Sequence, residues 1–128
     1  MFSHVMIGTD DVDEAKIFYD AALGVLDVPP GVIDEKGRLV YMHKGGRFLI
    51  TRPINGAPAT FANGGTLGFH AGSPELVDAW HAAGLAHGGT AIESPPGIRH
   101  ATEGRTVYLA YLRDPAGNKV CAYFKVSG

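Results

Sequence analysis

The chain has 128 residues, of which 45% are hydrophobic and 19% charged, a composition that suits one folded domain and excludes a long disordered tail. The formal net charge is −2, so the chain offers no basic stripe for a nucleic-acid backbone. No apolar stretch approaches the roughly 20 residues that a membrane helix requires.

The N-terminal segment lacks the basic region and apolar core of a signal peptide. The single cysteine, Cys121, has no partner for an intramolecular disulfide. We therefore expect a cytoplasmic protein that binds neither nucleic acid nor membranes.

Residues 4–24 predict a strand followed by a helix. Val5 and Ile7 alternate with other residue types, with the period of two that indicates one buried strand face. Asp11 followed by Glu14 is typical of a helix N-terminus, and Gly24 is the predicted helix end. The apolar stripe of this helix consists of Val12, Ala15, Phe18, Tyr19 and Ala22.

Three strands are expected next, within residues 28–33, 39–42 and 48–51, with Gly45 and Gly46 as a tight hairpin turn. The following segment, residues 55–65, is polar and rich in glycine. This composition is typical of a connector rather than of a helix or strand.

Residues 66–86 repeat the pattern of residues 4–24 without a gap. Leu67 and Phe69 alternate as Val5 and Ile7 do, Ser73 is the predicted helix cap, and Gly84 is the predicted helix end. Three more strands are expected within residues 90–93, 106–112 and 119–126, and we expect residues 95–105 to form a loop.

The order of elements is therefore βαβββ, used twice. This order predicts a single domain over residues 1–128, made of module 1 (1–54) and module 2 (66–128), which the linker 55–65 joins. The predicted fold class is α+β, with paired half-barrel sheets around a cavity and one helix outside each sheet.

The parity of the strands predicts which residues line the cavity. One face of each opening strand packs under its helix, so the opposite face lines the interior. The residues on this opposite face are His4, Met6, Gly8, Thr66, Gly68, His70, Lys119, Cys121 and Tyr123.

Two stretches resemble the vicinal oxygen chelate superfamily, which includes glyoxalase I, bleomycin resistance proteins, fosfomycin resistance proteins and extradiol dioxygenases. HVMIGTDDVDEAKIFYDAALG (residues 4–24) is similar to the opening strand and helix of that superfamily, and YLRDPAGNKVCAYF (residues 111–124) is similar to its closing hairpin. The resemblance implies a glyoxalase-like fold. It does not specify the reaction, because the superfamily carries many reactions on one scaffold.

The resemblance also implies four metal-ligand positions, on the first and last strand of each module. These correspond to His4, Thr66, Cys121 and a position within residues 48–51. Only His4 is a usual ligand there, since threonine is a poor one, the family usually carries glutamate at the position of Cys121, and residues 48–51 contain no carboxylate or imidazole. A divalent metal needs about three protein ligands. We therefore predict no cofactor and no metal bound in the usual way, while a zinc half-site of His4 and Cys121 remains an alternative.

Two cavity residues carry reactive groups. His4 is the candidate catalytic residue, as an acid–base group or as an interior histidine held by hydrogen bonds. Cys121 is either a nucleophile with a lowered pKa or a small buried side chain.

Other candidates lie on the closing strands and the expected loop. Tyr111 and Tyr123 are predicted to bring hydroxyls to the pocket, while the parity of Tyr108 relative to Tyr111 stays open. Arg99 and Arg105 either pair with an anionic ligand or form solvated surface. Arg52 is a weaker candidate of the same kind, and three histidines read as surface residues: His43, His81 and His87.

The favoured hypothesis is a protein that binds a small organic molecule in the sheet cavity without the usual metal, as the resemblance to bleomycin resistance proteins implies. The alternative is a glyoxalase-like, metal-dependent lyase or isomerase that uses His4. A third hypothesis is an interaction protein with a filled cavity. The resemblance also implies a homodimer.

Overall fold

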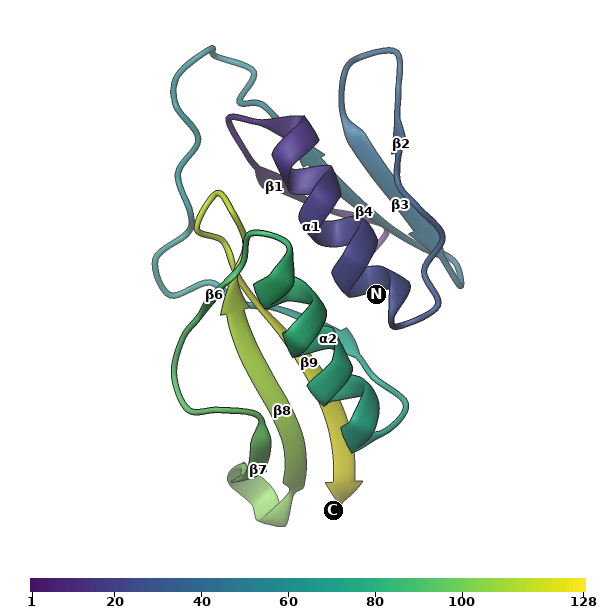
Figure 1. The fold of residues 1–128 in the computed structure, drawn as a ribbon, viewed down its shortest axis with the longest axis vertical. Helices are drawn as coiled ribbons and strands as arrows, with labels where there is room; N and C mark the ends of the chain where they lie inside the picture. Colours follow the sequence, from purple (N-terminus) through teal and green to yellow (C-terminus); the bar gives the residue numbers. More distant parts are fainter.

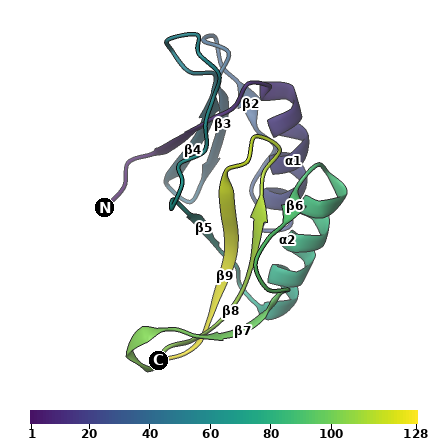
Figure 2. The ribbon, with the colours of Figure 1, turned by 90° about the vertical axis from the view of Figure 1, so that its left-hand side faces the viewer.

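The computed structural model describes residues 1–128 and contains two α-helices, α1 (Val12–Gly24) and α2 (Pro74–Ala86). The helices lie side by side and cover one side of the sheets, whose other side is open (Figures 1 and 2). This arrangement confirms the predicted α+β fold. Neither helix has the length and the apolar character needed to cross a lipid bilayer.

Each helix belongs to its own sheet. The first sheet contains, in spatial order, β1 (Val5–Gly8), β4 (Gly46–Thr51), β3 (Leu39–His43) and β2 (Val32–Ile33). The second contains β5 (Leu67–His70), β9 (Lys119–Ser127), β8 (Thr106–Arg113) and β6 (Thr90–Ala91), and β7 (Gly97–His100) also pairs with β8. In each sheet the opening strand is an edge strand that runs parallel to the last strand of its module. The two sheets do not close into a barrel.

Both predicted helix caps are present. The Asp11 side chain accepts a hydrogen bond from the Glu14 N–H at 3.0 Å, and the Ser73 hydroxyl accepts one from the Leu76 N–H at 3.2 Å. Each cap satisfies a backbone donor that has no partner within the helix. Residues close together in the sequence therefore determine where both helices begin.

Gly84 is not the end of α2, which continues to Ala86. A Cβ atom at Gly84 would lie 2.3 Å from Leu112 Cδ1 and 3.1 Å from Phe18 Cε1. This glycine therefore lets α2 approach β8 and α1 closely, a requirement that the sequence pattern of one helix does not reveal.

The loop predicted for residues 95–105 is wrong in part. Residues 97–100 form β7, and Thr102–Gly104 forms a short 3-10 turn, η1. Four residues carry too little periodicity to show a strand, and β7 exists because β8 supplies its hydrogen-bonding partner. The first hairpin turn also lies one residue earlier than predicted, because Lys44 and Gly45 are the residues with positive φ, at 50° and 83°.

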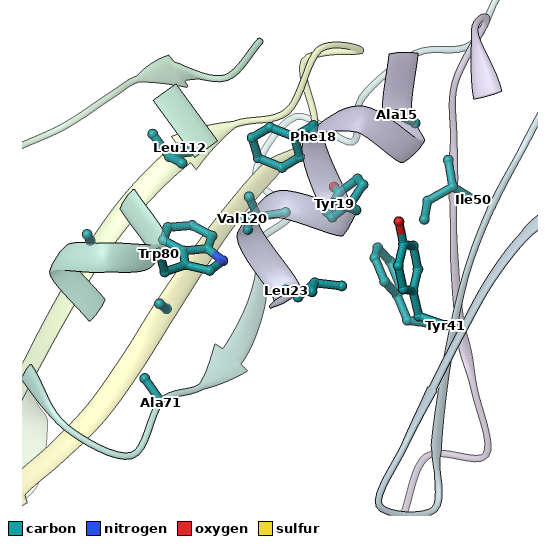
Figure 3. Close-up of a cluster of buried hydrophobic side chains, with 14 of the residues drawn as sticks. Ala15, Phe18, Tyr19, Leu23, Tyr41, Ile50, Ala71, Trp80, Leu112 and Val120 are labelled. Atoms are coloured by element: carbon teal, nitrogen blue, oxygen red, sulfur yellow. The ribbon is translucent and has the colours of Figure 1, made fainter. Parts of the chain in front are cut away.

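The predicted helix-facing side chains of the opening strands do pack into the core. Val5, Ile7, Leu67 and Phe69 are partly buried against a cluster that spans both modules. Figure 3 shows the centre of this cluster, where α1 contributes Phe18 and Tyr19 and α2 contributes Trp80. One continuous core therefore holds the two modules together.

A buried polar contact also joins the modules. The Tyr19 hydroxyl donates a hydrogen bond of 2.6 Å to the Asp114 carboxylate, and burial, followed by the nearby Asp114 charge, raises the pKa of Tyr19. The Asn118 side chain donates to the Gly8 carbonyl at 2.9 Å and to Asp114 at 2.9 Å. Both motifs that carried the family resemblance thus meet at this contact, within one chain.

Candidate functional site

The predicted cavity residues of module 1 lie at or near the open face. His4 immediately precedes β1 and is exposed, and its Nδ1 atom forms a hydrogen bond of 2.7 Å with the Ser3 hydroxyl. Met6 lies in β1 with 42% of its surface exposed. Thr66, which precedes β5 at the start of module 2, is also exposed.

In module 2 the strand register brings several predicted residues onto one sheet face. Cys121 is paired with Gly68 on one side and with Tyr111 on the other, and His70 is paired with Tyr123. Tyr108 lies on the opposite face, because its hydroxyl donates to Asp78 of α2 at 2.8 Å. The structure therefore resolves the parity that the sequence left open, with Tyr111 on the face away from the helix.

Basic side chains border this face, and each is bound within the chain. Arg105 donates to the Tyr123 hydroxyl at 3.2 Å, and Arg99 donates to the Ser94 and Pro95 carbonyls. The Lys119 ammonium is ion-paired with Glu93 and lies 4.6 Å from the centre of the Tyr111 ring. Because these basic side chains already have partners, they are less available to bind an anionic ligand.

Cys121 is buried, with 6% of its surface exposed. Burial raises the pKa of its thiol to about 11, while the Lys119 ammonium acts weakly in the opposite direction. Because the thiolate is the reactive form, this environment favours a small packed side chain over a nucleophile.

The Cys121 environment predicts slow alkylation. At pH 8 a pKa of about 11 leaves roughly 100-fold less thiolate than the ordinary value of 9.0. We expect iodoacetamide to modify the native protein about 100-fold more slowly than the same chain in denaturing urea, as followed by mass spectrometry. A native rate within tenfold of the unfolded rate would contradict this assignment.

The positions that the resemblance assigns to a metal do not supply a ligand set. No three His, Cys, Asp or Glu side chains are grouped as a metal site would require. His4 bonds to Ser3, and Cys121 lies against Gly68 and Tyr111. The possible metal ligands within one chain therefore do not fit the metal centre that the superfamily resemblance implies.

A cavity with a mostly hydrophobic lining lies elsewhere, at the junction of the two sheets. It has a volume of about 610 Å³, within the range of small-molecule pockets. We call it the seam cavity, because the edge strands β1 and β5 both border it. Its lining residues are Phe2, Val5, Leu23, Val28, Tyr41, His43, Gly46, Arg47, Phe48, Thr66, Leu67, Gly68 and Phe69. Only Thr66 and Gly68 belong to the set predicted from sequence.

Aromatic rings from both modules form the wall of the seam cavity. Phe48 of β4 stacks on Tyr41 at a centroid distance of 6.1 Å and meets Phe69 of β5 edge to face at 5.4 Å. Such arrangements are the favourable ones for aromatic pairs.

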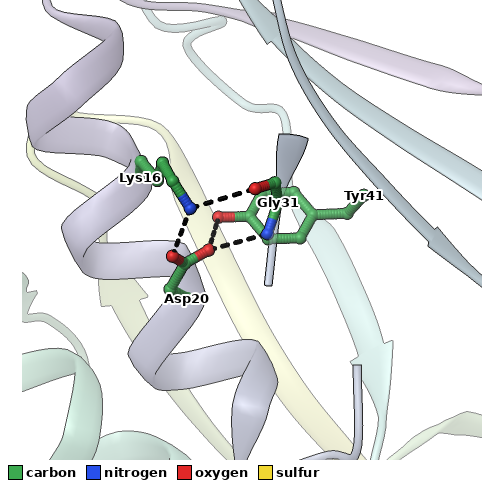
Figure 4. A network of polar contacts seen from close by, with 4 residues as sticks. All are labelled: Lys16, Asp20, Gly31 and Tyr41. Atoms are coloured by element: carbon green, nitrogen blue, oxygen red, sulfur yellow. Dashed lines mark hydrogen bonds and ion pairs between the residues drawn. The ribbon is translucent and has the colours of Figure 1, made fainter. Parts of the chain in front are cut away.

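A polar network holds the Tyr41 ring in place through its hydroxyl (Figure 4). Its hydroxyl donates to Asp20 at 2.7 Å, and Asp20 also accepts from Lys16 at 2.6 Å and from the Gly31 N–H at 2.9 Å. Burial acts to raise the pKa of Asp20, but these hydrogen bonds outweigh it and lower that pKa. Because its hydroxyl is engaged there, Tyr41 presents its ring to the cavity.

The polar residues of the seam cavity come from the β3–β4 hairpin. His43 is partly buried and lines the cavity, so reading it as a surface residue was wrong. Arg47 is exposed and lines the same cavity. Of the other two histidines predicted to be surface residues, His81 is partly buried, which lowers its pKa, while His87 is exposed. The weaker candidate Arg52 is also exposed.

Sequence parity missed most of this cavity for a geometric reason. Tyr41, Phe48, Leu67 and Phe69 are on the helix-facing side of their strands, where side chains usually fill the core. Along the sheet edges β1 and β5, Val5, Leu67 and Phe69 are only partly buried. With Tyr41 and Phe48 they line an opening. Only the pairing of β1 with β4 and of β5 with β9 shows where those edges lie.

Comparison with known proteins agrees with this fold. The family model described as "Glyoxalase/Bleomycin resistance protein/Dioxygenase superfamily" matches residues 1–122. A crystal structure of a glyoxalase/bleomycin resistance protein from Albidiferax ferrireducens T118 is 58% identical, with a TM-score of 0.92 over 96% of this chain and 98% of that one. No functionally curated protein matches the chain significantly.

More distant structures share the fold alone. A lactoylglutathione lyase from Agrobacterium tumefaciens is 23% identical, with a TM-score of 0.64 over 96% of this chain and 92% of that one. A glyoxalase/bleomycin resistance protein/dioxygenase family enzyme from Burkholderia phytofirmans PsJN is 19% identical, with a TM-score of 0.71 over 94% of this chain and 95% of that one. Because the family model spans nearly the whole sequence, the chain belongs to the glyoxalase/bleomycin resistance protein/dioxygenase superfamily.

Proposed function

We propose that this protein binds a small organic molecule in the seam cavity, without the metal that the resemblance implies. The observation that carries the proposal is the cavity of about 610 Å³ whose lining is mostly hydrophobic. Binding is favourable when an apolar ligand displaces water from a partly open apolar cavity of this size. The similarity to a glyoxalase/bleomycin resistance protein supports the same function.

The relation of the cavity to the two modules also supports ligand binding. Val5 and Phe48 come from module 1, while Leu67 and Phe69 come from module 2. The buried Tyr19–Asp114 contact and the shared core fix the modules relative to each other, so the cavity walls are held in place before a ligand arrives. Preorganisation of this kind reduces the entropy lost on binding.

A cavity-filling variant tests this function. Val5→Trp places an indole in the seam cavity, and we expect it to weaken binding of the neutral probe 2-naphthalenemethanol at least tenfold, a loss of roughly 1.4 kcal/mol. Isothermal titration calorimetry measures the affinity. Val32→Trp is the matched control, because Val32 lies on the edge strand β2, is 66% exposed and does not line the cavity.

The control is expected to bind the probe within twofold of the wild-type affinity. Thr66→Trp, at an exposed position of the cavity lining, is a second blocking variant in case Val5→Trp unfolds. If both blocking variants bind as well as the wild type, the ligand does not occupy the seam cavity.

We also propose that the protein binds no metal and that it forms a homodimer. Elemental analysis of protein purified without chelator tests the first point: a stoichiometric transition metal that is lost in His4→Ala would favour the metal-dependent lyase or isomerase instead. Size-exclusion chromatography with light scattering tests the dimer, and a monomer at micromolar concentration would contradict it.

A further inference from the structure

We infer that the ligand of the seam cavity has an apolar, ring-sized body and one carboxylate, which Arg47 binds at the end of the cavity formed by the β3–β4 hairpin. This inference rests on the proposed function and specifies its ligand class.

The walls of the cavity select for the apolar body. Phe48 and Phe69 meet across the two modules, and Leu67 and Val28 complete a wall without charge. Of the two side-chain hydroxyls in the lining, that of Tyr41 already donates to Asp20, and that of Thr66 is at an exposed position. A polar ring substituent buried here would lose its hydration without gaining a partner.

Arg47 is the charged group that remains available. It lies on β4 and lines the cavity, and it is absent from the ion pairs and from the hydrogen bonds that arginine side chains form in the chain. The other arginines near predicted site positions differ in this respect, since Arg99 donates to backbone carbonyls and Arg105 donates to Tyr123.

No acidic residue lines the seam cavity to compete for Arg47. The neighbouring residues on the hairpin are His43, which lines the same cavity, and Lys44, which lines an adjoining cavity of about 380 Å³. Asp27 is the one acidic residue of that adjoining cavity. The hairpin end of the seam cavity is thus basic, while most of the remaining lining is aromatic and aliphatic.

A guanidinium suits a carboxylate because its N–H groups form two parallel, charge-assisted hydrogen bonds with the two oxygens. Arg47 directly precedes Phe48 in β4, so the two side chains leave opposite faces of the strand, but both residues line the seam cavity. One ligand can therefore pack its ring against Phe48 while its carboxylate reaches Arg47. A neutral ligand of the same shape would use the wall alone.

Two probes of equal shape separate these contributions. We would measure Kd by calorimetry for 2-naphthoate and for 2-naphthalenemethanol at pH 8, where the carboxylate of the probe is ionised. We expect the wild type to bind the carboxylate about tenfold more tightly than the alcohol. Arg47→Gln should reduce this ratio to within twofold and leave the Kd of the alcohol nearly unchanged.

Arg52→Gln is the matched control, because it removes the same charge from another exposed arginine that does not line the seam cavity. It should keep the tenfold preference. Equal affinities in the wild type, or a preference that survives in Arg47→Gln, would overturn the inference and leave the proposed function intact. If neither probe binds the wild type, both the inference and the proposed function fail.

Discussion

Replacing Asp114 with alanine is expected to lower the free energy of unfolding by about 3–4 kcal/mol, because it leaves several buried donors without an acceptor. Asp114 is only 3% exposed. Its carboxylate accepts from the Tyr19 hydroxyl, the Asn118 side chain, and the N–H groups of Ala116 and Asn118. Urea unfolding followed by circular dichroism measures the loss.

Tyr19→Phe is the matched control for this prediction. It removes one hydroxyl from a fully buried ring and leaves Asp114 with its other three donors, so we expect a loss of only about 1–2 kcal/mol. In the double variant the two losses should not add, because both substitutions break the same hydrogen bond. A loss below 1 kcal/mol for Asp114→Ala would show that this contact does not hold the modules together.

The second large effect is expected at Gly84. Gly84→Val should destabilise the fold by about 3 kcal/mol, because the new side chain must enter a site where even a Cβ atom lies 2.3 Å from Leu112 Cδ1. Leu112 and Phe18 are both fully buried, so neither can move aside without disturbing the core. Thermal unfolding followed by calorimetry should show the loss as a lower Tm.

Gly24→Val, at the last residue of α1, is the control for this prediction. A Cβ atom at Gly24 would meet no other atom within 4 Å, and Gly24 is exposed at the helix end. We expect this variant to stay within about 0.5 kcal/mol of the wild type. If the two valine variants were equally stable, close packing at Gly84 would not explain why glycine stands there.

The two motifs shared with the superfamily have a structural role in this protein. Tyr19 and Asp114 belong to the two stretches that resemble the superfamily, and the structure uses both to connect the modules. Residues that preserve a scaffold are shared by proteins with different reactions. This explains why the motifs identified the fold while the substrate had to be inferred from the shape and charge of the seam cavity.

Local patterns in the sequence were sufficient for the helices, their caps at Asp11 and Ser73, the repeated module and the buried strand faces. Each of these depends on interactions between residues close in the chain, or on a hydrophobic period that any folded state must bury. Strand parity also placed Cys121 and Gly68 on the same face, and the register pairs them.

Tertiary structure alone decided the role of Gly84, the strand β7 and the position of the seam cavity. Close approach at Gly84 depends on where β8 lies, and β7 depends on pairing with β8. The seam cavity is bordered by the sheet edges β1 and β5, and side chains of both modules, among them Phe48, Phe69 and Arg47, line this one opening. Alternation within a strand specifies which face a side chain occupies, but only the packing of whole modules determines whether that face is filled or left open to a ligand.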